Sequence, residues 1–381
     1  MKILAGALML LPVLAFAQPN VSGVNSGNAI ANNSSVRISG SAFGTKPNPA
    51  PLKWDNFEAG AALPTETRLD TVQPEWVQFY HNSLGGALYT SRQAHSGARS
   101  VYNAVDRPGA MYVADPNGGP GPSIGQWETN LFRTPPSNTL FISYWFRVDT
   151  GGYGAQKMTR INSSEAAGGG GDYNGYGSYA FGGNAPCEEP QMDVSTDNGS
   201  TLNLGNVYLT TPGCGTWVHV QMGRTLNTIG VSNGWLMSSL VGYETLNFEN
   251  MQNIFVAGTH DGKSLQLDTV LLGLMCANFS QGDHTAMYID DMYIDNTRAR
   301  VELGNNAVYG SCSHREMQIP SSWSASAIDV TVNTGTFAAG SAWMFVIDAN
   351  GRVSPGYPVT VAAGPPVPVP GAPGKPILNG N

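Results

Sequence analysis

Glycine and proline interrupt this chain so often that they constrain its fold more than any other feature. The 381 residues include 47 Gly and 25 Pro, whereas charged residues make up only 12%. Gly and Pro favour turns, and the Val, Thr and Tyr residues between them favour strands. A helical protein would carry more Glu, Lys, Ala and Leu on its exposed faces. The sequence therefore predicts an all-β fold of many strands joined by turns.

The N-terminal residues predict the compartment. Lys2 precedes an apolar run that ends at Phe16, and Ala15 and Ala17 are the small residues that signal peptidase reads. The run is shorter than the roughly 20 apolar residues that a membrane span needs. We therefore predict a signal peptide over residues 1–17 and a secreted, extracellular protein with no membrane span. The bacterial periplasm and a cell surface are both compatible with this prediction.

The charge balance bears on the partner. The formal net charge is −8, the isoelectric point is about 5.2, and no stretch is rich in Lys and Arg. Nucleic-acid binding needs clustered basic residues. We therefore expect no nucleic-acid partner.

Four cysteines, at positions 187, 214, 276 and 312, suggest disulfides in an oxidising compartment. Three pairings are possible. The pairing of Cys187 with Cys214 and of Cys276 with Cys312 closes the shortest loops, so it is the one that we favour. A zinc site is less expected, because no two of the cysteines have the close spacing and the partner histidine that such a site requires.

The two flanks of the chain resemble each half of an IPT/TIG immunoglobulin-like domain. Residues 36–44 (VRISGSAFG) resemble its opening strand and turn, and residues 323–332 and 350–354 resemble its closing strand and hairpin. The resemblance implies one small sandwich made of residues 18–54 and 315–363, with residues 55–314 inserted into it. Two unrelated strand-rich flanks are the alternative. Residues 364–381 are rich in Pro and Gly and predict an extended tail.

The central region contains a series of strand candidates and no convincing helix. The clearest strands are residues 140–148, 157–162, 191–196, 217–226 and 287–294. So many strands over one region favour a single two-sheet sandwich over several small domains. We therefore predict an antiparallel jelly-roll sandwich with a second, smaller immunoglobulin-like β-sandwich.

Five segments of this region resemble the concanavalin A-like jelly rolls of lectins, laminin-G-type modules and polysaccharide lyases. They are residues 54–58 (WDNFE), 94–100 (AHSGARS), 140–148 (LFISYWFRV), 217–221 (WVHVQ) and 287–294 (MYIDDMYI). The resemblance implies an extracellular module that binds or cleaves a saccharide polymer. Galactose-binding-like jelly rolls share three of these segments and remain the architectural alternative.

Carboxylates at the two ends of the central region are candidates for a structural calcium site. They are Asp55, Glu58, Asp290 and Asp291. The first and last strands of such a sandwich usually pair, and calcium prefers a shell of oxygen ligands. Strand alternation predicts that only one of Asp290 and Asp291 points inward. The alternative is that these carboxylates accept hydrogen bonds from the neighbouring turn. We expect no other cofactor.

Strand alternation also predicts a polar face. In residues 217–222, it assigns Val218, Val220 and Met222 to the core, and His219 and Gln221 to the opposite face. If the strands that carry Arg160 and Gln191 are neighbours, one sheet presents all four polar side chains together. Any half-solvated strand shows such a face, so this pattern alone assigns no function.

A β-eliminating lyase could use these residue types. It needs a cation or an amide to neutralise the uronate carboxylate, and His or Tyr to transfer protons. The Arg-x-Glu-x-Arg and Gln-Ile-His strands of such lyases are absent. The candidate catalytic residues are Arg160, His219 and Tyr288, and the candidate substrate-binding residues are Gln191, Gln221, Tyr144, Tyr173 and Tyr176.

Tyr173 and Tyr176 lie in a glycine-rich stretch, where their rings could stack on sugars or pack on the protein's own surface. The first functional hypothesis is accordingly a secreted carbohydrate-binding or surface-adhesion protein whose partner is a polysaccharide or a cell-surface glycan. An extracellular polysaccharide lyase that cleaves a uronate polymer is the first alternative. A structural envelope or appendage protein is the second.

Overall fold

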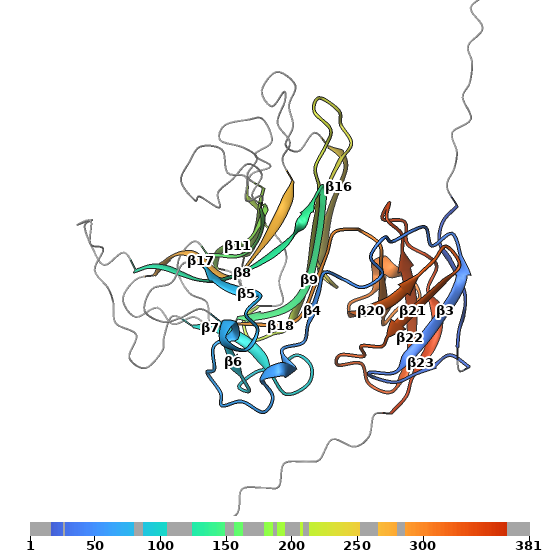
Figure 1. The fold of residues 1–381 in the computed structure, drawn as a ribbon, viewed down its shortest axis with the longest axis horizontal. Coiled ribbons are helices and arrows are strands. Elements are labelled where there is room, and N and C mark those ends of the chain that lie inside the picture. The colour runs from blue at the N-terminus through green and yellow to red at the C-terminus, as the bar shows by residue number, and fades with distance from the viewer. Residues whose placement is uncertain are drawn as a thin grey trace, which may run out of the picture.

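The computed structural model describes residues 17–25, 27–79, 87–104, 124–148, 156–162, 179–185, 189–194, 206–208, 213–251, 266–279 and 286–363. Residues 1–16 of the predicted signal peptide and the whole Pro-rich tail lie outside these ranges, as do Tyr173, Tyr176 and Cys187. The described chain is nearly all β-strand and forms two sandwiches, a larger central one and a smaller one (Figure 1). The predicted all-β class is confirmed.

Two sheets face each other in the larger sandwich. One has the order β13-β12-β11-β10-β17-β8-β5 and is called here the β10 sheet. Its strands are β5 (Trp76–Phe79), β8 (Ile124–Ser137), β10 (Gln156–Asn162), β11 (Tyr179–Ala185), β12 (Glu189–Val194), β13 (Asn206–Tyr208) and β17 (Leu267–Phe279). All of its strand pairs are antiparallel.

The opposing sheet, called here the β14 sheet, has the order β16-β15-β14-β9-β18-β7-β6, with β4 also paired to β18. Its strands are β4 (Lys53–Asp55), β6 (Leu88–Thr90), β7 (Ser100–Ala104), β9 (Thr139–Val148), β14 (Val218–Thr225), β15 (Gly234–Leu240), β16 (Glu244–Met251) and β18 (Ala286–Asp295). The short helix α1 (Leu69–Val72) and the 3-10 turn η1 (Glu58–Gly60) lie between β4 and β5.

The core between these sheets follows strand alternation. On β9, Leu140, Ile142 and Tyr144 belong to the core, as do Val218 and Val220 on β14. From the β10 sheet the core receives other side chains: Trp76, Phe132, Ile161, Leu267 and Val270. The two-sided burial explains why residues 140–148 form an almost continuous apolar run.

The smaller sandwich combines both flanks of the chain. Its order is β1-β3-β21-β20-β19-β22-β23-β2. Its strands are β1 (Asn20–Val24), β2 (Ala29–Ile30), β3 (Ser35–Ser41), β19 (Arg300–Gly304), β20 (Arg315–Trp323), β21 (Ala327–Thr331), β22 (Gly340–Ile347) and β23 (Tyr357–Val361), and the 3-10 turn η2 (Tyr309–Ser311) follows β19. β3 pairs with β21, although hundreds of residues separate them in sequence.

One long strand connects the two layers of this smaller sandwich. β20 pairs with β19 through its first residues and with β21 through its last, and a bulge lies between Pro320 and Ser322. Val36, Ile38 and Val330 on one side therefore pack against Val301 and other apolar residues on the other. Because β19 pairs with β20 and β22, the predicted boundary at residue 314 is too late, and the smaller sandwich already includes residues 300–304.

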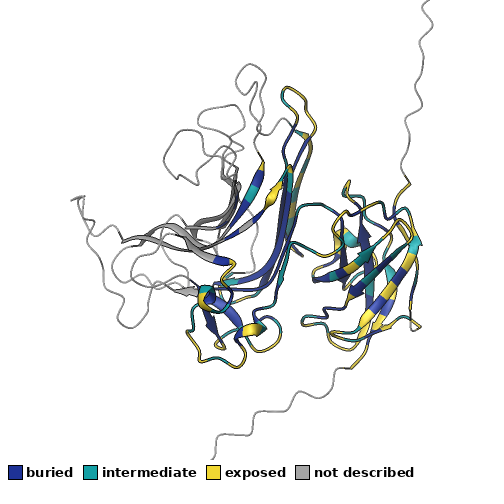
Figure 2. Cartoon of the chain, in the orientation of Figure 1, coloured by how far each residue is buried: buried dark blue, intermediate teal, exposed yellow. Residues whose placement is uncertain are grey.

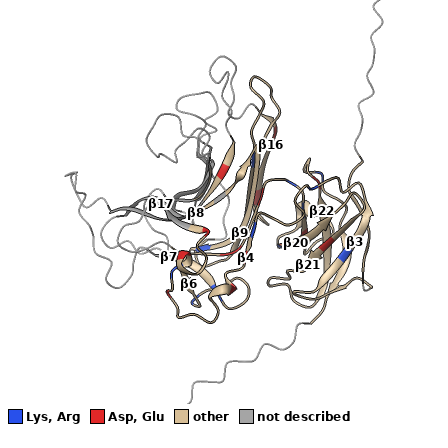
Figure 3. Cartoon of the chain, in the orientation of Figure 1, with Lys and Arg blue, Asp and Glu red and all other residues tan. Residues whose placement is uncertain are grey.

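The outer face of the β14 sheet is covered by the smaller sandwich. A buried cluster joins the two and consists of Phe141, Trp235, Met237, Tyr293 and Met317. Most residues of β9 and β14 are buried, because core side chains cover one face and β20 covers the other (Figure 2). Charged side chains are sparse over the described chain (Figure 3), and it contains no helix long and apolar enough to cross a membrane.

Candidate functional site

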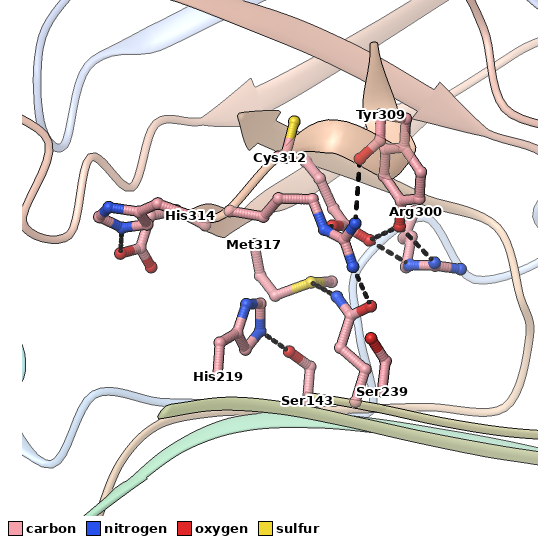
Figure 4. A network of polar contacts seen from close by, with 12 residues as sticks. Ser143, His219, Ser239, Arg300, Tyr309, Cys312, His314 and Met317 are labelled. Carbon is pink, nitrogen blue, oxygen red and sulfur yellow. Dashed lines mark hydrogen bonds and ion pairs between the residues drawn. The ribbon is translucent and has the colours of Figure 1, made fainter. Parts of the chain in front are cut away.

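The predicted polar face of β14 exists but is not open to solvent. Val218, Val220 and Met222 point into the core, and His219 and Gln221 lie on the opposite side, as strand alternation predicted. However, His219 is only 2% exposed and Gln221 only 1%. β20 lies over them (Figure 4), so the expectation that this face meets a polysaccharide is wrong.

His219 lies in an apolar and aromatic environment. Its Nε2 shares a hydrogen bond with Ser143 Oγ at 2.6 Å, and its ring stacks on Trp145 at 5.0 Å between centroids. Burial lowers the pKa of His219 to about 3, although Glu316 and Glu302 partly oppose this effect. The imidazole is therefore neutral at ordinary pH and cannot reach a polymer in solvent.

Gln221 belongs to a buried ionic network that includes Arg300, which Figure 4 labels. Its Oε1 accepts a hydrogen bond from Arg315 Nη2 at 3.0 Å, and Arg315 Nε lies 2.9 Å from Glu302 Oε2. Glu302 Oε1 lies 2.6 Å from Arg300 Nε. Burial alone would raise the pKa of Glu302, but Arg315 and Arg300 overcome it and lower that pKa to about 2. This network joins the two sandwiches.

A cavity of about 520 Å³ lies between the sandwiches beside this network. Trp235, Arg298 and Arg315 contribute to its lining. The guanidinium of Arg298 already covers the Trp235 ring at 4.1 Å and pairs with Glu249 at 2.6 Å. Because the ring face and the arginines have intramolecular partners, this cavity is a weaker saccharide site than its size suggests.

The predicted calcium ligands act as hydrogen-bond acceptors. Asp55 accepts from the Phe57 backbone, Gln73 and Trp76, and Glu58 Oε1 accepts from the backbone N–H groups of two residues in the 94–100 turn. These donors match the alternative in which the carboxylates stabilise the turn. Calcium binding by Asp55, Glu58, Asp290 and Asp291 stays a prediction.

The expected separation of Asp290 and Asp291 by strand alternation is not observed. Asp290 Oδ2 accepts from the backbone N–H groups of His95 and Ser96, and Asp291 Oδ1 accepts from Ser96 Oγ at 2.9 Å. Both side chains therefore reach the same turn. Asp291 has φ 49°, at a bulge in the pairing of β18 with β9, and this bulge breaks the alternation that was expected to separate the two carboxylates.

Arg160 and Gln191 lie on β10 and β12, and therefore in the β10 sheet. His219 and Gln221 lie in the opposing β14 sheet. The predicted convergence of these four residues on one sheet is wrong. The sequences of these three strands did not reveal which of them are neighbours, because strand pairing is a long-range property.

Of the four tyrosine candidates, Tyr144 and Tyr288 lie within the described residues, and both are buried. Tyr144 points into the core, where its hydroxyl accepts a hydrogen bond from Thr159 Oγ1 at 2.8 Å. Tyr288 is 3% exposed and stacks on Tyr102 on the opposite side of the β14 sheet. Neither has the access that a proton-transfer or sugar-binding group requires.

Cys312 is a free, buried thiol, so the predicted disulfide between Cys276 and Cys312 is wrong. Its Sγ points towards the backbone oxygens of Asn306 and Val308. Cys214 is disulfide-bonded. Because Cys187 lies outside the described residues, its pairing with Cys214 stays a prediction.

Sequence reasoning did not single out Tyr208 on β13, or Lys157 on β10, as candidate site residues. Gln191 pairs with Tyr208 and with Gly182, and Gly182 pairs with Lys157. Residues paired directly across strands lie on the same face of a sheet. The signal was the polar Asn-Val-Tyr segment that contains Tyr208, but it is too short to be recognised as a strand without its partners.

Comparison with known proteins gives no family. No family model and no curated protein matches the sequence. Among solved structures, an endo-β-1,4-glucuronan lyase from the fungus Trichoderma reesei is 12% identical, with a TM-score of 0.42, over 61% of this chain and 94% of that one. An alginate lyase from Aplysia kurodai is 8% identical, with a TM-score of 0.45, over 64% and 98%. Similarities of this size assign neither a substrate nor an activity.

Proposed function

We propose that this chain is a secreted protein that binds a polysaccharide on the β10 sheet, on the face opposite the core. The observation that carries the proposal is the cross-strand register of β10, β11, β12 and β13. The corresponding face of the β14 sheet is covered by the smaller sandwich, so it offers no comparable surface. The disulfide-bonded Cys214 and the predicted signal peptide support an extracellular location.

The face can be assigned from the core. Thr159 and Ile161 are buried between the sheets, so alternation assigns position 160 to the other face. Arg160 pairs with Ala180, and Ala180 pairs with Asp193. One row of this face thus contains a cation, a methyl group and a carboxylate from three adjacent strands.

The next row has the same character. It contains Lys157, Gly182, Gln191 and Tyr208 in adjacent strands. The central strand, β11, contributes only Ala180 and Gly182 to the two rows. The cationic, amide and phenolic residue types at these positions have the chemistry to bind sugar hydroxyls and carboxylates.

The test compares binding to a panel of neutral and uronate polysaccharides by affinity electrophoresis or on a glycan array. Arg160→Ala and Gln191→Ala should each weaken binding by about tenfold or more, since each removes a hydrogen-bonding group from the proposed binding face. The matched control is Arg37→Ala, which removes a cation that is 59% exposed on the smaller sandwich. Equal loss of binding in Arg37→Ala, or unchanged binding in both Arg160→Ala and Gln191→Ala, would contradict the proposal.

A polysaccharide lyase is the second candidate, and the row that contains Lys157, Gln191 and Tyr208 favours it. β-Elimination on a uronate requires, first, a group that neutralises the carboxylate and, second, a group that transfers protons. The C5 proton is removed, the bond between C4 and O4 breaks, and the departing O4 takes up a proton. Arg160 or Gln191 has the chemistry for the first task, and Lys157 or Tyr208 for the second. His219 and Tyr288 are not part of this version, because both are buried on the other sheet.

Unsaturated product can be followed by ultraviolet absorbance on a panel of uronate polymers. We expect Tyr208→Phe to reduce the rate by at least about a hundredfold if the phenol transfers the proton. Tyr288→Phe should retain the parent rate. If no polymer gives an absorbance change while binding is intact, the lyase hypothesis is rejected and the carbohydrate-binding hypothesis is retained.

A further inference from the structure

We propose that His95, His314, Glu316 and Asp291 form a site for a divalent metal ion of the zinc type at the boundary between the two sandwiches. The site is separate from the proposed polysaccharide-binding face and does not depend on it. The four residues come from three segments: the turn over residues 94–100, the bulge of β18, and the start of β20 with the residue before it.

Three of the ligand atoms already converge. His314 Nε2 lies 2.7 Å from Glu316 Oε1, and His95 Nε2 lies 2.9 Å from the same oxygen. One ligand atom from each of these three residues lies within 4.8 Å of the other two. Tetrahedral zinc with ligand bonds of about 2.0–2.2 Å separates its ligands by about 3.3 Å. Shifts of a few tenths of an ångström would therefore open the space that the ion needs.

Asp291 provides an independent observation. Its side chain is 2% exposed, and its Oδ2 lies 4.0 Å from His95 Nε2. Within the described part of the chain, this buried oxygen has no hydrogen-bond partner. A buried carboxylate oxygen without a donor is costly, whereas a metal ligand in this position is not.

The donor set selects the class of ion. Two imidazoles and two carboxylates suit zinc and related first-row ions, whereas calcium and magnesium prefer oxygen ligands alone. This donor set therefore differs from the oxygen shell of the predicted calcium site, although Asp291 belongs to both.

The surroundings hold the ligands in place. His95 stacks on Trp145 with centroids 3.7 Å apart, and Trp145 Nε1 donates to Glu316 Oε2 at 3.1 Å. Gly335, with φ 48°, lies so close to the Glu316 carboxylate that a side chain there would collide with it. The side chain of His314 is 23% exposed and leaves a route from solvent. An ion in this position would bind the larger sandwich to the smaller one.

The first test uses the full secreted chain after treatment with a chelator. Equilibrium dialysis against Zn²⁺ with elemental analysis should give one bound ion per chain. X-ray absorption at the zinc edge should show nitrogen and oxygen neighbours that include two imidazoles. No bound zinc, or sulfur in the first coordination shell from Cys276 or Cys312, would overturn the proposal.

The second test uses variants that keep a hydrogen-bond donor. His95→Gln and His314→Gln should each weaken zinc binding by at least about tenfold, because each removes one ligand. Zinc should raise the thermal midpoint of the parent and have a smaller effect on these variants. The matched control is His219→Gln, which alters a buried histidine outside the cluster and should retain one ion. Parent-like zinc affinity in both ligand variants would contradict the site even if their stability falls.

Discussion

At the scale of single residues, position on a strand did not determine exposure. His219 and Gln221 alternate with core residues, which is typical of a solvated face, and yet both are almost fully buried. His219 Nε2 shares a hydrogen bond with Ser143, and Gln221 Oε1 accepts one from Arg315. A polar side chain at such a position can contact another domain or bind a ligand. The alternation pattern is the same in both cases, so only the surface that packs against the strand distinguishes them.

His219 leads to a prediction about pH. Its pKa is lowered from 6.5 in a model compound to about 3 in the folded chain, so the unfolded state binds the proton more tightly. The stabilisation from the neutral ring is complete above about pH 6.5 and is lost as the pH falls towards 3. The free energy of unfolding of His219→Gln should depend less on pH over this window than that of the parent. Urea denaturation at several pH values measures this difference.

The control for this measurement is Ser341→Gln, which changes an exposed residue of the smaller sandwich without altering a titratable group. This variant should keep the pH dependence of the parent. If His219→Gln has the same slope as the parent between pH 6.5 and 3, the histidine is not the group responsible.

At the scale of elements, regular alternation assigned most side chains correctly, and bulges account for an exception. The core faces of β9 and β14 follow the two-residue period. At Asp290 and Asp291, the bulge in β18 directs both carboxylates to one turn. Nothing in the local sequence marks this bulge, because it is created by the pairing of β18 with β9.

The hydrogen bond between Tyr144 and Thr159 connects the two sheets of the larger sandwich, and a substitution can test it. Tyr144→Phe removes the acceptor of the hydrogen bond from Thr159 on β10, in a site without solvent. The free energy of unfolding should fall by about 1 kcal/mol, as measured by chemical denaturation. Polysaccharide binding should not change, since the hydroxyl faces the core.

A double-mutant comparison checks this contact. It uses Tyr144→Phe, Thr159→Val and the double variant that carries both changes. Because both partners are then apolar, the double variant should lose less stability than the sum of the single variants. Additive losses would show that the two hydroxyls do not interact, and weakened polysaccharide binding by Tyr144→Phe would restore this tyrosine as a ligand-binding residue.

At the scale of the whole molecule, the two sandwiches form a shared interior. Met317 of β20 packs with Phe141, Trp235 and Tyr293 of the larger sandwich. The ion pairs of Glu302 with Arg300 and Arg315 lie beside this cluster. We therefore expect the two sandwiches to unfold together.

Met317→Asp tests this coupling by burying an unpaired carboxylate at the interface, which is strongly unfavourable. Differential scanning calorimetry should show one transition for the parent and two for the variant. Ser341→Asp adds the same charge at an exposed position of the smaller sandwich and should keep a single transition. A single, unshifted transition for Met317→Asp would rule out Met317 as a coupling residue.

The sequence by itself determined the β class, the main strands and the division of their residues between two faces. These properties are local, because turn residues and two-residue periodicity act over a few positions. It also identified Arg160, Gln191, His219 and Gln221 as polar positions on strands. It could not say which strands are neighbours, since β3 pairs with β21 and His219 meets β20 across long stretches of chain.

Only the tertiary structure decided which face a ligand can reach. It covered His219 and Gln221 with the smaller sandwich, placed Arg160 and Gln191 in the other sheet, and brought His95 to His314 and Glu316. The physical reason is that burial depends on the second surface that packs against a strand. That surface comes from a distant segment, and no local pattern in the strand encodes it.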